Sequence, residues 1–440
     1  MTTAPRISII IPTHNRKALL LENLQALARQ TIPMSEMEVV VVADGCSDGT
    51  AQALLTASFP FALRVAEQAP QGPSAARNHG ARLARGEILL FLDDDIEANP
   101  RLVQAHAESH AGQTRRVAIG YLPPILHAQT GFFREELRGW WEAMFSAMLV
   151  PGYRYRYSNL LTGNFSISSS LFWQAGGFDL QFRCHEDYEL GWRLIKLGAI
   201  FQFVPQALGY HHENTLMERT FQRKQDEGQA DVYLSRKHPE LLPTLQVARL
   251  VNYGGFFTRK FYRLAFDRPA LGERVSRFLA WLMKLMEKWE LYYRWQKLLE
   301  ILLVYNYLCG VAKIFPTRAE WHDFVRQTQA DPVWGTPEMT IDLAEGLDAA
   351  QALLDQYRPD AVKFSHGQYV LRCEPAYAGV EPFRGEHLRV YLAYVLRDDY
   401  LRWAVRPNLN ETHPQQRLFR KLIDQHLAQM NHEQDISETA

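Results

Sequence analysis

The sequence has little of what marks several large classes of protein. The formal net charge of the 440-residue chain is −1, so it lacks the basic excess that a dedicated nucleic-acid binder carries, and no nucleic-acid partner is expected. Its four cysteines, Cys46, Cys184, Cys309 and Cys373, lie far apart and form no CxxC pair. They indicate free thiols in a reducing compartment and exclude both a disulfide framework and a cysteine zinc site.

Long apolar runs are also missing. No stretch of about 18 or more apolar residues occurs, so no transmembrane helix is expected. The N-terminal MTTAPRISIIIPTHN lacks the apolar core of a signal peptide, because its apolar run is only one strand long and ends at a proline. We therefore expect a cytoplasmic protein. Peripheral contact with the inner face of a membrane and homo-oligomer formation stay open.

The sequence does have 47 % apolar residues, and strand and helix signals alternate over its first 120 residues. Apolar runs predict buried strands, and the segments between them have helical spacing. The expected strands are 7–11, 38–42, 62–65 and 87–92, and the expected helices are 17–30, 48–57 and 73–84. This repetition predicts an α/β fold with a Rossmann-like, mostly parallel sheet and helices on both faces.

The rest of the chain is less regular. Residues 121–160 are aromatic and irregular, and a helix (187–197), a strand (200–204) and a polar helical stretch (213–240) follow. Long aromatic helices are expected within 271–312, a linker at Pro332–Pro337, and strands at 361–364, 369–373 and 388–395. These signals predict a catalytic domain (1–240), a helical extension (241–330) and a small α+β C-terminal domain (331–440).

Three polar segments follow directly after expected strands, where ligands of such sheets bind. They are Pro12-Thr13-His14-Asn15, Asp44-Gly45 and Asp93-Asp94-Asp95. Carboxylates about 5 Å apart repel by about 3 kcal/mol per pair at an effective dielectric near 20, so three consecutive aspartates need compensation.

The period of two along a strand lets Asp93 and Asp95 converge and turns Asp94 away, although an early turn would still bring Asp94 to a ligand. A converging pair suits Mg²⁺ or Mn²⁺, which prefer oxygen ligands. The alternative is an acidic loop that caps the helix after Pro100.

Further candidates support a site for a charged ligand. Asp44 can accept hydrogen bonds from a base or ribose, and Arg77 can reach a diphosphate, unless it is an ordinary surface arginine. Glu186 and Asp187 open a helix, where acids stabilise the helix dipole, but one carboxylate there could also act as a general base. His211 or His212 could supply an imidazole metal ligand, or the two could form a solvent-exposed pair.

Five segments in order resemble family 2 glycosyltransferases, which have the GT-A fold. They are SIIIPTHNR, VVVADGCSDGT, GPSAARNHGARLARGEILLFLDDDI, TGNFSISSSLFWQAGGFDLQF and HEDYELGWRLIKLGA. The resemblance spans Ile7 to about Glu213, roughly half of the chain. Two departures are visible: Ala43 replaces the first aspartate of the usual Asp-Asp-Gly, and TFQRKQDEGQ replaces the Q-x-x-R-W signature of processive members, which makes a polymerase a poorer match.

The resemblance implies a role for each matching residue. Pro12, Thr13, Asn15 and Asp44 would hold the donor nucleotide, Asp93 and Asp95 the ribose and the metal, His211 the metal, and Asp187 would be the catalytic base. The implied enzyme transfers a sugar, with inversion, from a nucleotide-diphosphate sugar to a hydroxyl of a glycan, a lipid-linked or another acceptor. We favour a UDP-linked donor and Mn²⁺ or Mg²⁺ as cofactor.

Two other functions were weighed. A nucleotidyltransferase would need a glycine-rich loop with Lys or Arg after the first strand, and PTHNRK has no glycine. A non-catalytic sugar-nucleotide-binding protein would be expected to lack the base or the Asp-x-Asp pair, and both are present. Sugar transfer is therefore the preferred function.

Overall fold

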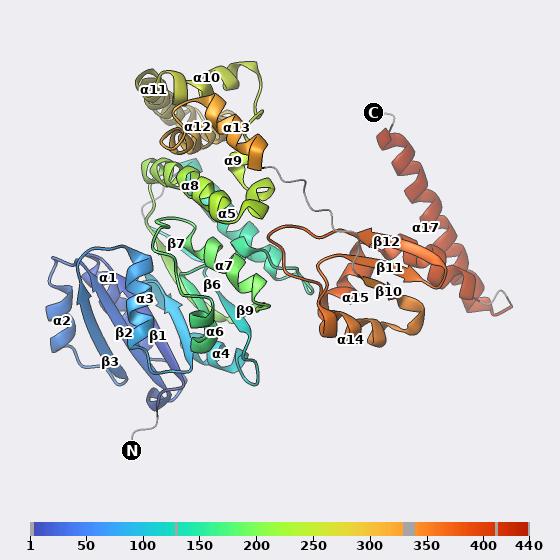
Figure 1. The fold of residues 1–440 in the computed structure, drawn as a ribbon, viewed down its shortest axis with the longest axis horizontal. Coiled ribbons are helices and arrows are strands. Elements are labelled where there is room, and N and C mark those ends of the chain that lie inside the picture. Colours follow the sequence, from blue (N-terminus) through green and yellow to red (C-terminus); the bar gives the residue numbers. More distant parts are fainter. Residues whose placement is uncertain (1–3, 128–130, 329–338, 410–411, 439–440) are drawn as a thin grey trace. The chain divides into compact units, whose positions relative to one another are not determined.

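The computed structural model of the protein describes residues 4–127, 131–328, 339–409 and 412–438 (Figure 1). The chain divides into two compact units. The first comprises Met1–Met148 and Tyr155–Pro332, and the second comprises Leu149–Arg154 and Val333–Ala440. The predicted linker Pro332–Pro337 lies outside the described residues.

The first unit is built on a nine-stranded sheet, in the order β3-β2-β1-β4-β8-β6-β9-β5 with β7 paired to β9. The strands are β1 (Ile7–Thr13), β2 (Met37–Asp44), β3 (Ala62–Gln68), β4 (Ile88–Leu92), β5 (Ile96–Ala98), β6 (Arg116–Tyr121), β7 (Pro124–Leu126), β8 (Asn164–Ser168) and β9 (Ile200–Glu213). β1 to β4 run parallel, while β8 runs antiparallel to both β4 and β6. The predicted mostly parallel sheet is confirmed.

The inner parallel strands β1, β2 and β4 form because their β-branched and aliphatic residues can be buried on both faces, while β3 is a half-buried edge strand. Every residue of β2 and β4 is buried. The chain order reverses beside β1, which pairs with β2 on one side and β4 on the other. A reversal of this kind opens a crevice at the carboxyl ends of the strands, so the fold itself places a site beyond Thr13 and Leu92.

Helices pack on this sheet, as predicted (Figure 1). They are α1 (Lys17–Leu27), α2 (Thr50–Thr56), α3 (Pro73–Leu83), α4 (Leu102–Ser109), α6 (Ser169–Gln174) and α7 (Glu186–Lys196). α3 lies close on β1 and β2, because Gly80 leaves room where a Cβ would come within 2.5 Å of Ile10 Cγ2. Pro73 occupies the first turn of α3, the position where proline costs no hydrogen bond.

Two expectations for the middle of the chain are corrected. Residues 121–160 are not irregular, since they contain β7, the long helix α5 (Gly131–Met148) and the short helix η2 (Tyr157–Asn159). The many aromatic residues of α5 obscured its helical pattern in the sequence. Its Phe145 and Met148 are buried. The strand expected at 200–204 continues to Glu213 as β9, because its second half pairs with β5 and β7.

A helical segment completes the first unit (Figure 1). It contains α8 (Met217–Lys237), η3 (Pro239–Thr244), α9 (Gln246–Arg249), α10 (Phe256–Asp267), α11 (Pro269–Lys288), α12 (Tyr292–Ala312) and α13 (Arg318–Thr328). Its core is built around Met283, Trp295 and Leu302, against which Phe132 of α5 and Phe221 of α8 pack. The helices predicted within 271–312 are confirmed. Among the described residues, none of the helices has the length and apolar content needed to cross a membrane.

The second unit is a small α+β structure, as predicted. Its sheet has the order β10-β11-β12, with β10 (Met339–Asp342), β11 (Val362–His366) and β12 (Tyr369–Glu374). Its helices are η4 (Leu343–Glu345), α14 (Leu347–Tyr357), α15 (Gly385–Tyr394), α16 (Arg397–Tyr400), η5 (Leu401–Val405), η6 (Arg406–Asn408) and α17 (Pro414–Glu438). The strand expected at 388–395 is wrong. Leu388, Leu392 and Leu396 recur every four residues and all face the core, which is the spacing of a helix.

Candidate active site

Two adjoining cavities open at the carboxyl ends of the sheet. The first has a volume of about 900 Å³ and is lined by Pro12 to Arg16, Asp44, the 70–77 segment, Asp93 and Asp94. The second has a volume of about 670 Å³ and is lined by Trp140, Trp141, Asp95, Glu186, Asp187 and His211. Arg16, Arg77 and Asp93 line both cavities. Every residue predicted for the site therefore lies in one continuous region.

The three aspartates stand on a turn, and the expected alternation along a strand is wrong. β4 ends at Leu92, and the Ile96 N–H donates a hydrogen bond to the Asp93 carbonyl at 3.4 Å. The early turn directs Asp94 into the first cavity, where it accepts a hydrogen bond from Thr13 Oγ1 at 2.7 Å. The chain thus presents all three carboxylates to the two cavities.

Cations of the chain compensate the repulsion between these carboxylates. Arg16 Nη1 lies 3.0 Å from Asp94 Oδ1 and 2.7 Å from Asp95 Oδ2. Burial raises the pKa of Asp94 to about 6, although Arg16 acts in the opposite direction. Burial also acts to raise the pKa of Asp95, but His211 and Arg16 together hold it below its ordinary value. At neutral pH Asp94 and Asp95 are therefore charged and paired with Arg16.

Arg77 is buried, so the alternative of a surface arginine is wrong. Only 4 % of it is exposed, and its guanidinium lies 2.7 Å from Asp93 Oδ1 and 3.1 Å from Glu186 Oε1. The ring of Phe178 lies 5.8 Å from the guanidinium carbon and closes one side. Arg77 therefore joins the acidic turn after β4 to the start of α7.

The far end of the first cavity is shaped by Asp44 and Asn15. The Asp44 carboxylate accepts hydrogen bonds from Gln68 Nε2, Gln71 N and Gly72 N at 2.7–2.9 Å, which fixes the loop after β3. Asn15 adopts a left-handed conformation, with φ of 54°, and its Oδ1 accepts a hydrogen bond from the Ser47 N–H. The loops after β1, β2 and β3 thus form one rigid rim around this cavity.

Glu186 and Asp187 begin α7 and take different partners. Glu186 is paired with Arg77, as described above. Asp187 accepts a hydrogen bond from the Tyr188 N–H at 2.9 Å and lines the second cavity. Burial, reinforced by the negative charge of Glu186, raises the pKa of Asp187 to about 7. A carboxylate with that pKa can take a proton from a hydroxyl near neutral pH.

The two histidines on β9 have separate surroundings. His211 Nε2 lies 3.7 Å from Asp95 Oδ1, and the edge of Trp141 packs against its ring. His212 stacks on His127 and lies 3.5 Å from Glu97. Both side chains are only 17 % exposed, so the alternative of a solvent-exposed pair is wrong.

The predicted metal ligands are partly assembled. Asp95 Oδ1 is buried, makes no hydrogen bond and lies 3.7 Å from His211 Nε2, and oxygen and imidazole atoms placed in this way suit Mn²⁺ or Mg²⁺. The other ring nitrogen, His211 Nδ1, lies 3.9 Å from Glu213. Asp93, the third expected ligand, is turned toward Arg77. Within the ranges that the structure describes, no three His, Cys, Asp or Glu side chains are already arranged around one cation position.

Comparison with known proteins identifies the family. The sequence model described as glycosyl transferase family 2 matches residues 8–175. The chain is 33 % identical over 306 residues to validoxylamine A glucosyltransferase of Streptomyces hygroscopicus subsp. jinggangensis, covering 62 % of this chain and 71 % of that protein. The chain belongs to glycosyltransferase family 2. It is therefore an enzyme of sugar transfer, which confirms the predicted class and disfavours both alternative functions.

Other family 2 relatives are more distant. Probable glycosyltransferase YdaM of Bacillus subtilis is 25 % identical over 229 residues, covering 48 % of this chain and 52 % of that protein. Among solved structures, mannosyltransferase PcManGT from Pyrobaculum calidifontis, in complex with GDP-Man and Mn²⁺, has a TM-score of 0.46 at 19 % identity, covering 71 % of this chain and 88 % of that chain.

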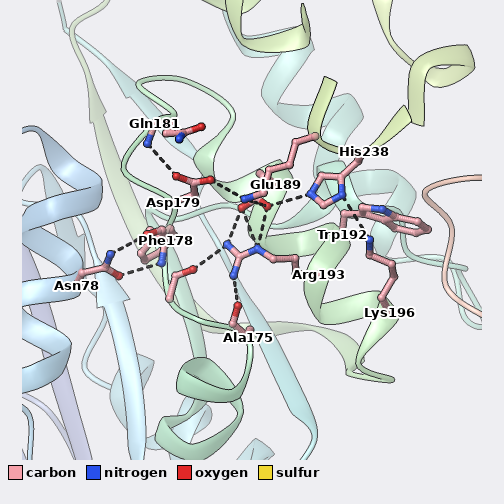
Figure 2. Close-up of polar contacts among 12 residues, drawn as sticks. Asn78, Ala175, Phe178, Asp179, Gln181, Glu189, Trp192, Arg193, Lys196 and His238 are labelled. Carbon is pink, nitrogen blue, oxygen red and sulfur yellow. Dashed lines mark hydrogen bonds and ion pairs between the residues drawn. The ribbon is translucent and has the colours of Figure 1, made fainter. Parts of the chain in front are cut away.

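The sequence did not point to the buried network behind α7 of this family 2 enzyme. Figure 2 shows Glu189 at its centre, bonded to Arg193 and His238. Lys237 lies 2.8 Å from Glu189 and 2.5 Å from Asp179. Although burial opposes it, hydrogen bonds from His238, Arg193 and Lys237 lower the pKa of Glu189 to about 2. The spacing of four between Glu189 and Arg193 was the available signal, but many surface pairs share it.

This network holds the loop that precedes the acidic pair. Arg193 donates hydrogen bonds to the carbonyls of Ala175 and Gly177 (Figure 2). The Asn78 side chain donates from Nδ2 to the Phe178 carbonyl and accepts at Oδ1 from the Phe178 N–H. The turn at Gly176 and Gly177 is therefore held by hydrogen bonds from both α3 and α7. Sequence reasoning also missed Arg16, which is adjacent to the predicted Asn15 and neutralises two of the aspartates.

Proposed function

We propose that this protein transfers a sugar, with inversion, from a nucleotide-diphosphate sugar to an acceptor hydroxyl, with Asp187 as the general base. The observation that carries the proposal is the arrangement of the cavities. Asp187 stands in the second cavity, while Asp93 and Arg77 form the wall that it shares with the first. A donor in the first cavity and an acceptor in the second would meet at that wall.

The first cavity is proposed to hold the donor. Its volume of about 900 Å³ lies within the range of small-molecule sites, about 300–1,000 Å³. Pro12, Thr13, Asn15 and Asp44 would surround the nucleotide, and Asp94 lies beside Thr13 at the floor. We propose a UDP-linked sugar. The relative's name records glucosyl transfer, so a glucose donor is the first to test.

The diphosphate is proposed to lie at the shared wall. Asp93, Asp95 and His211 would hold a Mn²⁺ or Mg²⁺ ion, and the distance of 3.7 Å between Asp95 Oδ1, which makes no hydrogen bond, and His211 Nε2 supports this. When bound, the ion would neutralise charge that develops on the leaving diphosphate. Arg77 keeps Asp93 oriented through its ion pair and adds a fixed positive charge beneath the site.

The reaction at Asp187 can be written with its electrons balanced. Asp187 takes the proton of the acceptor hydroxyl, and the hydroxyl oxygen forms a bond to the anomeric carbon. The bond from that carbon to the diphosphate oxygen breaks, and its electron pair leaves with the diphosphate. Attack from the opposite face inverts the configuration, so an α-linked donor gives a β-linkage. Glu186 stays paired with Arg77 and holds Asp187 in place.

The acceptor is proposed to be a hydroxyl of a glycan, a lipid-linked sugar or another glycoconjugate. Trp140 and Trp141 of α5 line the second cavity, and aromatic faces of this kind pack well against the apolar faces of sugar rings. Trp140 is 51 % exposed and so lies where an entering acceptor could reach it. The α5 segment is accordingly the proposed acceptor-selecting element.

Peripheral contact with an anionic membrane is proposed for α11. The outer face of α11 carries four basic residues and two aromatic ones, opposite the buried Met283: Arg274, Arg277, Phe278, Trp281, Lys284 and Lys288. Phe278 and Trp281 are 58 % and 53 % exposed and stack on each other. The helical period places the acids of α11, Glu273 and Glu287, to one side of this face. Basic and aromatic side chains on one face are typical of membrane-surface helices.

The deciding experiment is a transfer and hydrolysis screen across sugar nucleotides in the presence of Mn²⁺. We expect turnover with a UDP-sugar, β-configuration in the product, and loss of turnover in Asp187→Asn with donor binding retained. An α-linked product from an α-linked donor would overturn the inverting mechanism. Normal transfer by Asp187→Asn would overturn the assignment of the base.

A further inference from the structure

His185, directly before the acidic pair, has a backbone conformation that histidine rarely adopts. Its φ is 61°, in the left-handed region, and its side chain makes no capping hydrogen bond to α7. A residue with a Cβ persists there only when its surroundings over-determine it, and such residues cluster at functional sites. The imidazole stacks on Tyr188 with ring centroids 4.4 Å apart. Helix capping therefore does not account for this histidine.

The partner of His185 is a buried carboxylate from the helical segment. Asp231 Oδ1 on α8 lies 3.0 Å from His185 Nδ1, and the Asp231 side chain is 4 % exposed. On its other side, Asp231 Oδ2 accepts a hydrogen bond of 2.5 Å from the Tyr307 hydroxyl on α12. Tyr307, Asp231 and His185 thus form a chain of contacts that leads from α12 to the loop carrying Asp187.

The position of Asp231 is fixed by the packing of two helices. α8 and α12 approach so closely that a Cβ on Gly228 would collide with the Tyr307 carbonyl, and one on Gly310 would collide with the Gln225 carbonyl. Two glycines at one helix crossing let the backbones meet directly. Asp231 lies less than one turn from Gly228, so its carboxylate cannot drift away from His185.

The charges around this pair come from several elements. Burial acts to lower the pKa of His185, but Asp231 holds it above its ordinary value. The same imidazolium opposes the effects of burial and of Glu186 on the pKa of Asp187. The other titratable groups that face the pair are Glu227 and Arg223 of α8, Glu186 and Tyr188 of α7, Cys184, and Tyr157 of η2.

We propose that His185, kept as a cation by Asp231, is a positioning residue that holds Asp187 in its deprotonated form at the second cavity. The proposal rests on the proposed role of Asp187 as the general base. A buried carboxylate beside a second one, Glu186, would otherwise bind a proton and lose its function as a base. Asp231, which lines neither cavity, thereby contributes to the reaction without touching a substrate.

The test is the pH profile of kcat/KM in Asp231→Asn and in His185→Asn. Asparagine tolerates the left-handed conformation, so the second variant removes the cation with little backbone strain. An opposite charge within a few Å lowers a carboxyl pKa by about one unit or more. We expect the acidic limb to move up by about one pH unit in both variants, with activity regained above it and the KM for the donor unchanged.

Tyr307→Phe is the matched control, because it removes the hydrogen bond on the far side of Asp231 and leaves the ion pair in place. Its acidic limb should stay where it is in the parent protein. Limbs that stay unmoved in both charge variants would overturn the proposal, as would an equal shift in Tyr307→Phe. The Asp187→Asn variant distinguishes failure of the proposed function from failure of the role proposed for His185. If it transfers sugar normally, the proposed function fails. If it is inactive while the limbs stay unmoved, only the role of His185 fails.

Discussion

Arg77 Nη2 lies 2.7 Å from Asp93 Oδ1, and the neighbouring Nη1 lies 3.1 Å from Glu186 Oε1. One buried cation thus holds together the acidic turn after β4 and the start of α7. These two segments are more than ninety positions apart in the sequence, and they carry the proposed donor side and acceptor side of the reaction. The distance between donor and base is therefore set by a single guanidinium.

Replacing Arg77 by alanine should weaken the fold and abolish activity. Breaking a buried ion pair by removing one partner costs about 3–5 kcal/mol; Asp93 is 34 % exposed at its side chain, so we expect the lower end, about 3 kcal/mol. Arg77→Lys keeps the charge but cannot reach both carboxylates with a planar fork. We expect the lysine variant to be more stable than the alanine variant but to have little transfer activity. Thermal unfolding and transfer rates would be measured together, and full activity in the lysine variant would refute the bridging role.

Asp95→Asn should remove the dependence of donor binding on metal. The variant loses one charged oxygen ligand, and even loss of an outer-shell partner typically costs about 10-fold or more in metal affinity. Calorimetric titration of a UDP-sugar with and without Mn²⁺ would show the parent gaining affinity from the ion and the variant gaining none. Glu97→Gln is the control, since Glu97 lies on the next strand and pairs only with His212 among the described residues. An Asp95 variant that keeps its response to Mn²⁺ would contradict the site.

The activity of the enzyme should rise with pH and level off above neutrality. Burial raises the pKa of Asp187 to about 7, so its base form is the minority species below that pH and dominates above it. Measurements of kcat/KM between about pH 5.5 and 9 should give one acidic limb near 7. Asp187→Asn should lower kcat by about 10²- to 10⁴-fold, the usual contribution of a general base. A profile that is flat through pH 7 would rule out this titration.

Glu189 should make the fold sensitive to acid. Its pKa is lowered to about 2 in the folded chain, against about 4.3 in an unfolded one, so it contributes about 3 kcal/mol above that value. The contribution is lost as the pH falls from about 4.3 toward 2. Glu189→Gln should therefore lower the unfolding temperature at pH 7 and reduce its change between pH 5 and pH 3. Glu273→Gln, at an exposed pair with Arg277, should change neither. An unchanged pH response in Glu189→Gln would contradict this account.

Anionic vesicles should bind the protein through α11. Co-sedimentation with vesicles that contain phosphatidylglycerol should capture it, and neutral phosphatidylcholine vesicles should capture much less, because each basic residue near an anionic surface contributes about 1 kcal/mol. Phe278→Ala with Trp281→Ala should abolish capture and leave turnover on a soluble acceptor unchanged. Leu55→Ala, an exposed apolar residue on α2, is the matched control. Equal capture of the double variant would exclude this face.

The parallel half of the sheet could be predicted from sequence because its apolar runs are compatible with only one arrangement, a sheet covered by helices on both faces. Runs such as Val39 to Val42 are buried on both faces, and only a sheet covered by helices achieves that. The position of the site followed from the same rule, since Thr13, Asp44 and Asp93 end three of those strands. Leu388 to Val395 could not be assigned in this way, because a short apolar run fits a strand or a helix until its packing partners are known.

The partners of the site residues were out of reach for a different reason. Arg16 was adjacent to a predicted residue, but nothing local shows that it reaches Asp94 and Asp95, almost eighty positions later. The same holds for His185 and Asp231, which come together only because α8 passes behind α7. Asp94 enters the first cavity because of the turn that ends at Ile96, and a period of two does not predict where the strand ends.

The glycine crossing of α8 and α12 bears on how this enzyme can be shortened. A chain cut after residue 240 would retain every side chain proposed to touch donor, metal or acceptor, yet Gly228 would face water where the backbone of α12 had been. Asp231 would keep its carboxylate and lose the helix whose backbone packs against α8 beside it. Such a fragment would contain all the proposed active-site residues but would lack the helix packing that supports Asp231. Its failure to transfer sugar would therefore not contradict the roles proposed for those residues.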